Sequence, residues 1–151
     1  MENLQDLEIR VYRPTDKANV IGLWQDCGLI VPWNNPEADI ARKVKDSPEL
    51  FFVAELSDEL ISTCMAGFDG HRGWIYFLAV KNQYRQRGIA TKMVIHAESA
   101  LLAVGCPKLE LMVRESNNEV MSFYQKNAYQ KEPVVVLSKR LMEDKPHKYG
   151  A

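Results

Sequence analysis

Gln83-Tyr84-Arg85-Gln86-Arg87-Gly88-Ile89-Ala90 follows an apolar run and opens an amphipathic segment. This pattern predicts a basic turn between a strand and a helix. The first N–H groups of a helix have no partner within the helix, and the helix dipole adds partial positive charge at the same end. A phosphate fits such an end, and Arg85 and Arg87 would add charge at its rim. The stretch therefore predicts a site for a phosphate-bearing cofactor.

Length and composition indicate a single domain over residues 1–151, with a core from about 7 to 141 and a loose polar tail from 143 to 151. The net charge of −1 gives no general attraction to nucleic acid or to an anionic membrane. No apolar stretch approaches the roughly 18 residues of a membrane span. The polar N-terminus does not resemble a signal peptide, and the three cysteines form no C-x-x-C pair. We therefore expect a cytoplasmic protein with reduced thiols.

Hydrophobic periodicity and turn residues predict the order β-α-α-β-β-β-α-β-α-β. Because antiparallel hairpins come first, this order favours an α+β or mixed α/β fold over a doubly wound sheet. The expected strands cover residues 7–13, 50–56, 60–68, 74–80, 108–114 and 133–141. The expected helices cover about 16–28, 37–45, 89–105 and 117–126.

The last expected helix carries Asn117 and, seven residues later, Tyr124. At about 100° per residue, seven residues bring the chain almost back to the same azimuth, so both would lie on one helix face. Other roles are open to both residues. Asn117 or Ser116 is a good N-cap, and a helical tyrosine is often a core residue with its hydroxyl at the edge.

With these two features the chain resembles the GNAT superfamily of N-acetyltransferases, which use acetyl-coenzyme A. The first family motif, Arg/Gln-x-x-Gly-x-Gly/Ala, matches at Arg85, Gly88 and Ala90. The second, an Asn about seven residues before a Tyr and then a Gly-Phe pair, matches at Asn117 and Tyr124. Ala128-Tyr129 replaces the Gly-Phe pair. The resemblance covers roughly residues 8–141.

Two loops sharpen the resemblance. Pro32-Trp33-Asn34 and Asp69-Gly70-His71-Arg72-Gly73 look like the corresponding segments of the small bacterial GNAT proteins called YpeA. The resemblance implies a GNAT acyltransferase fold, with a mostly antiparallel sheet of six or seven strands flanked by helices. It also implies a splay between the fourth and fifth strands.

The resemblance further implies a site for acetyl-coenzyme A. Backbone N–H groups from Gln86 to Ala90 would hold the pyrophosphate, and Gly88 would allow close approach. The pantetheine arm would pair with the main chain near the end of the fourth strand, where an N–H could polarise the thioester carbonyl. Tyr124 would protonate the departing thiolate as general acid. The implied cofactor-binding residues are Leu78, Ala79, Val80, Arg85, Gln86, Arg87, Gly88, Ile89, Ala90 and Asn117.

The general base is less defined. Ribosomal-protein alanine acetyltransferases carry a Leu-Glu-Val-Arg strand whose Glu is their base, whereas this chain has Leu111-Met112-Val113-Arg114. Met112 therefore replaces that carboxylate. Glu110, two residues earlier on the same strand face, is a candidate base. Glu115, Asp69, His71 and a water chain to solvent are the others.

The acceptor would be bound by loops, which carry no readable specificity code. The expected pocket residues are Trp33, Asn34, Asp69, His71 and Arg72, although a Trp in a proline-bounded loop is equally suited to partial burial. Histidines without ligand-like spacing predict no metal.

We therefore expect transfer of an acetyl group to a primary amine of a small-molecule or peptide acceptor, by a monomer or homodimer. The alternative is a non-catalytic acyl-coenzyme A sensor that uses the same cleft. A nucleotide-triphosphate loop is disfavoured because the Gly-Lys-Ser/Thr ending is missing.

Overall fold

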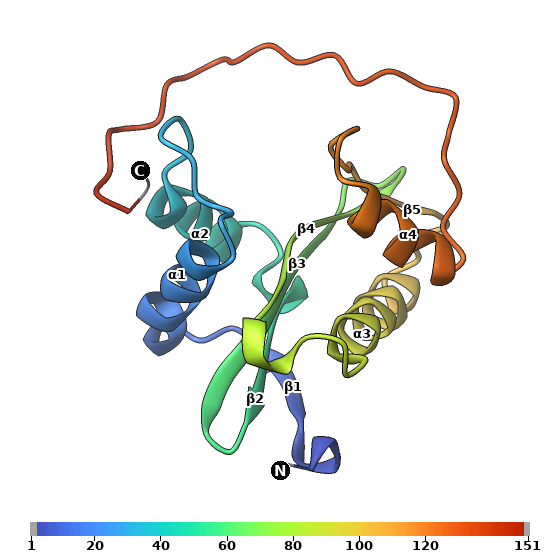
Figure 1. Ribbon diagram of the computed structural model, residues 1–151. Helices are drawn as coiled ribbons and strands as arrows, with labels where there is room; N and C mark the ends of the chain where they lie inside the picture. The colour runs from blue at the N-terminus through green and yellow to red at the C-terminus, as the bar shows by residue number, and fades with distance from the viewer. Residues whose placement is uncertain (1–2, 150–151) are drawn as a thin grey trace.

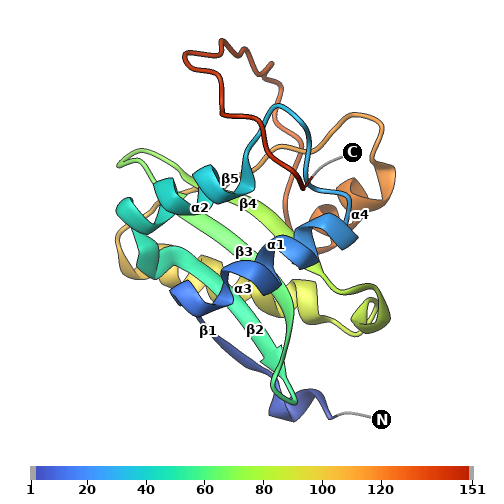
Figure 2. The ribbon, with the colours of Figure 1, turned by 90° about the vertical axis from the view of Figure 1, so that its left-hand side faces the viewer.

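A computed structural model describes residues 3–149 and shows one sheet with helices on both faces (Figure 1). Helices α1 and α2 cover one face, and α3 and α4 lie on the other side (Figure 2). The strands are β1 (Glu8–Val11), β2 (Phe51–Leu56), β3 (Glu59–Phe68), β4 (Gly73–Val80) and β5 (Leu109–Glu110). The α-helices are α1 (Lys17–Asp26), α2 (Pro36–Lys45), α3 (Ile89–Ala103) and α4 (Asn118–Lys126). Short 3₁₀ helices cover Leu4–Asp6, Pro14–Asp16, Pro48–Leu50 and Asn82–Tyr84.

The sheet has the order β1-β2-β3-β4-β5, antiparallel except for the parallel pair β4–β5. This mixed α+β architecture confirms the predicted fold class. Strands β4 and β5 pair only where Gly73 and Trp74 meet Leu109 and Glu110. Beyond this point the ladder stops, so the predicted splay between the fourth and fifth strands is also confirmed.

The predicted number of strands was wrong for the residues described, which form five strands rather than six or seven. The expected strand at 108–114 is reduced to Leu109–Glu110, because β4 diverges and offers no partner beyond that point. The expected strand at 133–141 is absent, and its residues run as exposed, irregular chain. Strong β-propensity makes a strand only where another strand supplies hydrogen-bond partners.

Strand alternation divides the core into two layers. Phe52, Ala54 and Leu56 of β2 pack with α3, whereas Phe51 and Val53 pack with α1 and α2. All five side chains are buried. Because successive strand residues point to opposite faces, a buried β2 reads as a continuous apolar run and supports both layers.

Within the described residues, the C-terminal tail makes hydrogen bonds to the α2 region. After α4 the chain crosses from the α3–α4 side to the α1–α2 side in one long arch (Figure 1). It then contacts α2 and the loop before it, where Asp144 accepts a hydrogen bond from the Asn35 N–H at 2.9 Å. The Tyr149 hydroxyl donates to Glu37 at 2.9 Å. The tail that was expected to be loose thus makes contacts as far as Tyr149, and residues 150 and 151 lie outside the described part.

Candidate active site

The loop before α3 has the geometry of an anion-binding helix start. Gly88 precedes α3 with φ of +81°, and Gln86 has φ of +61°. The helix begins where the Lys92 N–H donates to the Gly88 carbonyl at 3.1 Å. The N–H groups of Ile89, Ala90 and the next residue therefore lie in the first turn, ahead of any helical acceptor. The predicted strand–turn–helix junction is present.

Position 88 favours glycine because of its backbone conformation, not because a side chain there would collide with neighbouring atoms. Its positive φ is one that L side chains rarely adopt, and a Cβ built there meets nothing within 4 Å. The loop from Arg85 to Gly88 is exposed. No other part of the described chain therefore crowds the main chain at Gly88, so a ligand can approach it there.

The two arginines of the loop occupy different positions. Arg85 turns back onto β4, where its Nε donates to the Val80 carbonyl at 3.1 Å. Its Nη2 lies 3.5 Å from Cys27 Sγ, so this side chain links the end of β4 to the end of α1. Arg87 lies over the Tyr84 ring, with its Cζ 5.5 Å from the ring centroid. Both side chains remain exposed and keep positive charge beside the loop.

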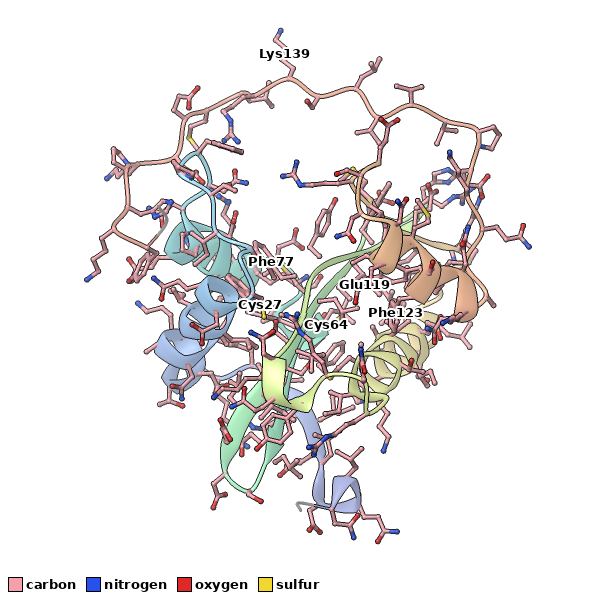
Figure 3. All side chains as sticks on the ribbon, in the orientation of Figure 1. Cys27, Cys64, Phe77, Glu119, Phe123 and Lys139 are labelled. Atoms are coloured by element: carbon pink, nitrogen blue, oxygen red, sulfur yellow. The ribbon has the colours of Figure 1, made fainter. Side chains whose placement is uncertain are left out.

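A bulge interrupts β4 in the middle of the molecule. Thr63 pairs with Ala79 and Met65 pairs with Tyr76, so Cys64 lies opposite two residues of β4. One of them, Phe77, has φ of +52°, an uncommon conformation for a bulky residue. Cys64 and Phe77 lie between the two helical layers (Figure 3). A bulge re-aims the main chain and ends regular pairing, here next to the splay.

Two buried hydroxyl groups hold the bulged strand in place. The Thr63 hydroxyl donates to the Phe77 carbonyl at 2.8 Å and accepts from Trp24 Nε1 at 3.0 Å. The Ser62 hydroxyl donates to the Ala79 carbonyl at 2.7 Å. Both side chains are fully buried. Where the bulge disturbs the ladder, side chains thus satisfy and orient the β4 carbonyl groups.

Tyr124 is buried on α4, beside Cys64 and with its ring 5.5 Å from that of Tyr129. Burial, and secondarily the Cys64 thiol, raise the pKa of the Tyr124 phenol above its usual value. Its hydroxyl has no hydrogen-bond partner among residues 3–149. No fully buried side-chain N or O atom of the described residues lacks a partner, so this hydroxyl reaches accessible surface. It is a protonated donor at neutral pH with its hydrogen bond still to make.

Asn117 is the N-cap of α4, as the alternative reading of the sequence allowed. Its Oδ1 accepts from the Val120 N–H at 3.1 Å. The side chain is exposed and its amide nitrogen donates to no described residue. Asn117 therefore caps the helix with its oxygen and retains a free amide N–H₂ group for another acceptor.

Each candidate general base is either bound to another group of the protein or lies on an exposed turn. Arg72 Nε lies 3.1 Å from Glu110, which pairs with Trp74 three residues before the bulge, about 10 Å along the strand. Asp69 accepts from the backbone N–H groups of Arg72 and His71, which hold the pKa of its carboxyl below the usual range. A carboxylate held in this way is a weaker base. His71 and Glu115 lie on exposed turns.

The expected acceptor residues form two separate groups. Asp69, His71 and Arg72 build the turn between β3 and β4, where Asp69 also accepts from Trp74 Nε1 at 3.3 Å. Trp33 is 55 % exposed, and the Asn34 amide oxygen accepts from Arg140 Nη2 at 2.9 Å. Through Arg140, the tail therefore contacts the second group, Trp33 and Asn34.

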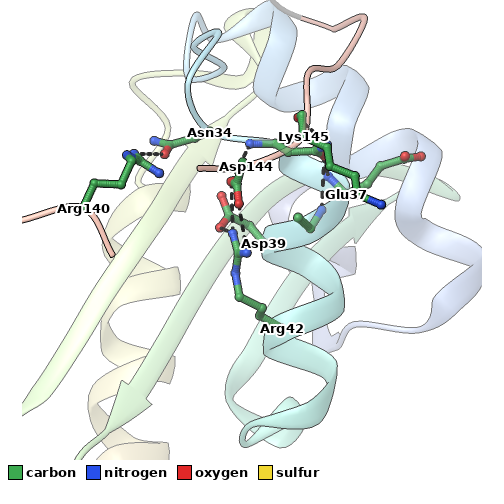
Figure 4. Close-up of polar contacts among 9 residues, drawn as sticks. Asn34, Glu37, Asp39, Arg42, Arg140, Asp144 and Lys145 are labelled. Carbon is green, nitrogen blue, oxygen red and sulfur yellow. Dashed lines mark hydrogen bonds and ion pairs between the residues drawn. The ribbon is translucent and has the colours of Figure 1, made fainter. Parts of the chain in front are cut away.

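The tail contacts form a polar network on α2. Arg42 bridges Asp144 at 3.0 Å and Asp39 at 2.7 Å (Figure 4). Asn35 Nδ2 donates to the Lys145 carbonyl at 3.1 Å. A cavity of about 450 Å³ lies beneath this part of the tail, lined by Arg42, Asp144 and residues 138–142. No short sequence pattern predicted the bulge of β4 or the polar network between the tail and α2, because both depend on residues that are far apart in the chain.

Within residues 3–149, no group of three or more His, Cys, Asp or Glu side chains is placed to hold a metal ion. No helix in the same range combines the length and the apolar composition needed to cross a membrane.

Comparison with known proteins agrees with this geometry. Residues 6–129 match the model of the acetyltransferase (GNAT) family. An acetyltransferase of Pectobacterium atrosepticum is 46% identical over 141 residues, which is 93% of this chain and all of that protein. A protein of Yersinia pestis named as an uncharacterized N-acetyltransferase is 45% identical over the same shares.

Solved structures show the same fold at lower identity. An aminoglycoside N-acetyltransferase in complex with coenzyme A has a TM-score of 0.72 at 16% identity, covering 90% of this chain and 95% of that one. The PaiA N-acetyltransferase of Thermoplasma acidophilum, also with coenzyme A, has a TM-score of 0.68 at 21% identity, covering 85% and 92%.

Proposed function

The chain belongs to the GNAT family of acetyltransferases, and we propose that it transfers an acetyl group from acetyl-coenzyme A to the primary amine of a small-molecule or peptide acceptor. The observation that carries the proposal is the buried Tyr124 phenol, whose hydroxyl has no hydrogen-bond partner among the described residues and which lies near Cys64, opposite the bulge of β4. GNAT acetyltransferases use acetyl-coenzyme A, so the residues present must fit that donor.

The loop before α3 fits the pyrophosphate. A diphosphate needs several donors pointing at one place and room for the main chain to approach. The first-turn N–H groups of α3 and the open space above Gly88 meet both needs. Arg87 adds charge beside them. We assign the pyrophosphate to the backbone from Gln86 to Ala90, with Arg85 and Arg87 at the rim.

The bulged end of β4 fits the pantetheine arm. Pairing between β4 and β5 ends at Trp74 and Glu110, so the later residues of β4 have no strand neighbour on that side. An extended amide chain can pair with such an edge. We assign this role to Leu78, Ala79 and Val80, and we assign a hydrogen bond from the free Asn117 amide to the arm.

When bound, acetyl-coenzyme A supplies an activated thioester. The amine nitrogen forms a bond to the acetyl carbon while the carbon–sulfur bond breaks, and Tyr124 gives its phenolic proton to the leaving sulfur. The raised pKa keeps that proton in place at neutral pH until the transfer. A main-chain N–H group near the end of β4 would polarise the thioester carbonyl. The amine proton leaves to solvent through water, because Glu110 and Asp69 are engaged elsewhere. Water then returns a proton to the Tyr124 phenolate.

The test measures release of free coenzyme A thiol with a panel of primary amines. We expect Tyr124→Phe to lower kcat by about 100-fold or more without weakening acetyl-coenzyme A binding measured by calorimetry. Tyr129→Phe is the matched control, because that neighbouring hydroxyl donates to Glu98 and has no catalytic role here. Unchanged turnover of Tyr124→Phe across pH would remove Tyr124 from the mechanism. Binding of acetyl-coenzyme A without turnover of any amine would overturn the proposed reaction.

A further inference from the structure

Trp24 of α1 contacts the bulge of β4 in two ways. Its indole ring stacks on the Phe77 ring, with the ring centroids 3.9 Å apart and 13° between the planes. Its Nε1 donates to the Thr63 hydroxyl at 3.0 Å, and that hydroxyl donates to the Phe77 carbonyl at 2.8 Å. The Trp24 side chain is fully buried. One tryptophan therefore holds both the ring of Phe77, directly, and its main-chain carbonyl, through Thr63.

The core fixes the position of Trp24. Its ring also stacks on that of Phe51 in β2, with centroids 6.3 Å apart and 26° between the planes. The Phe51 ring in turn stacks on Tyr12, at 4.7 Å and 11°. Tyr12, Phe51 and Trp24 are all buried. A continuous stack of aromatic rings thus runs from the end of β1 to the bulge, and Phe77 is supported from the α1 side by the packed interior.

The conformation of Phe77 needs such support. Its φ of +52° lies in the left-handed region, which is unfavourable for a bulky L residue and persists only where the surroundings enforce it. The bulge also changes the face to which Phe77 points. Residues two apart in a regular strand share a face, yet Ile75 packs in the α3 layer and Phe77 packs in the α1 layer. Phe77 thus faces Trp24 only because the strand is bulged.

The Thr63 hydroxyl transmits this support to the main chain. A hydroxyl has one hydrogen to donate, and since Trp24 donates to the Thr63 oxygen, that hydrogen goes to the Phe77 carbonyl. The described residues contain no cis peptide bond, so the Leu78 N–H points opposite to the Phe77 carbonyl, away from Thr63 and β3. The other edge of β4 has no strand neighbour beyond Trp74. Trp24 therefore sets, through Thr63, the direction of one N–H group at the splay.

We propose that Trp24 is a positioning residue for the acetyl transfer: through Thr63 it holds the Phe77–Leu78 peptide so that the Leu78 N–H donates to the thioester carbonyl oxygen. A donor that is already in place stabilises the negative charge that develops on such an oxygen without having to reorganise. A loosened peptide would lose this alignment and leave the contacts to the rest of coenzyme A intact. The inference rests on the proposed function, and it adds a residue of α1, on the side of the sheet opposite to α4 and Tyr124 (Figure 1).

The test compares acetyl-coenzyme A with S-ethyl-coenzyme A, which has the same arm but no thioester carbonyl. In nuclear magnetic resonance spectra of isotope-labelled protein, we expect the Leu78 amide proton to resonate further downfield with acetyl-coenzyme A, because only this ligand offers the carbonyl. Trp24→Phe keeps an aromatic ring and removes the indole N–H, so the difference should disappear. Both ligands should bind with wild-type affinity in calorimetry, and kcat should fall by about 10- to 100-fold.

Trp74→Phe is the matched control. Trp74 also donates its indole N–H, to Asp69 at 3.3 Å, but it lies near the start of β4, before the bulge. This variant should keep the Leu78 difference. Benzothienylalanine in place of Trp24 keeps the bicyclic ring and replaces only the N–H with sulfur. It should therefore fold even if Trp24→Phe does not, and it should give the same loss at Leu78.

The outcomes separate this inference from the proposed function. A wild type that binds neither ligand would remove both. A wild type that binds both ligands without a difference at Leu78 would overturn the inference alone. The same holds for a Trp24 variant that keeps the wild-type difference or the wild-type kcat, for one that loses affinity for both ligands equally, and for a difference that Trp74→Phe also abolishes. If no amine is acetylated but the Leu78 difference is present and depends on Trp24, the proposed reaction fails and the positioning of Leu78 stands.

Discussion

The proposed donor side and the proposed acceptor side of the molecule are built in opposite ways. The donor side consists of one continuous strand, turn and helix, from β4 to the start of α3. The loop around Asn34, one of the two groups of residues expected to bind the acceptor, is instead held by the tail through contacts such as Asn34–Arg140 and Asn35–Asp144, which span 106 and 109 residues. This loop and the tail are the proposed acceptor side. A local site depends on the conformation of a few residues, whereas an assembled site depends on tertiary contacts that can be broken one by one.

We expect the largest effect from a substitution that disrupts only the proposed donor side. Gly88→Ala places a Cβ at φ of +81°, which costs about 1–2 kcal/mol and moves the loop to relieve the strain. Loss of aligned N–H groups should weaken acetyl-coenzyme A binding by about 10- to 100-fold in calorimetry. Gly105→Ala is the control, because φ is +89° at the far end of the same helix. It should lower stability similarly and leave donor affinity unchanged. Equal affinity losses would refute a local donor site.

The next largest effect should come from removing the Thr63 hydrogen bonds that hold the bulge of β4. Thr63→Val keeps the shape but leaves the Phe77 carbonyl and Trp24 Nε1 without their partner. We expect the free energy of unfolding to fall by about 2 kcal/mol and kcat to fall, since the bulge is no longer held. Urea unfolding and steady-state kinetics measure both. Thr63→Ser keeps the hydroxyl and should stay near wild type, and a Thr63→Val enzyme with wild-type kcat would contradict the role given to the bulge.

We expect a smaller effect from a substitution that weakens only the contacts of the proposed acceptor side. Asp144→Asn weakens the contacts to Arg42 and Asn35, so the Asn35 amide should exchange hydrogen faster while donor affinity is unchanged. Arg42, and then the Asn35 N–H, hold the pKa of Asp144 below its usual range. The contact is therefore complete at neutral pH and is lost as pH falls through that lowered pKa. Hydrogen exchange followed by mass spectrometry should show acid loosening in wild type and little further change in Asp144→Asn.

The smallest effect concerns helix ends. Both α3 and α4 end in a Schellman motif, with hydrogen bonds from Cys106 to Leu101 and from Tyr129 to Tyr124. The left-handed residue is Gly105 in α3 but Ala128 in α4, with φ of +71°. Ala128→Gly should therefore raise the free energy of unfolding by about 1 kcal/mol in urea titrations. A loss of stability would mean that the Ala128 methyl group contributes packing that outweighs its strain.

Sequence patterns predicted the local parts of the molecule well. The loop before α3, the N-cap at Asn117 and the turn at Asp69 were all recognisable because each follows from residues within one or two turns of chain. The strand expected at 133–141 was wrong, since valine content reports propensity and cannot report whether a partner strand is present. The tail was expected to be loose because its polar composition carries no trace of Arg42 or Asn35, which lie about 100 residues earlier.

The sequence by itself determined the family, the order of the elements as far as α4 and the turn that presents Gly88 at the start of α3. These depend on hydrophobic period, on turn residues and on the φ that glycine permits, all of which act locally. Only the tertiary structure decided three further features: Phe77 lies in a bulge held by Thr63, the buried Tyr124 hydroxyl has no hydrogen-bond partner within residues 3–149, and the tail crosses to α2. Each depends on which distant side chains meet, and that is set by packing of the whole chain rather than by any one segment.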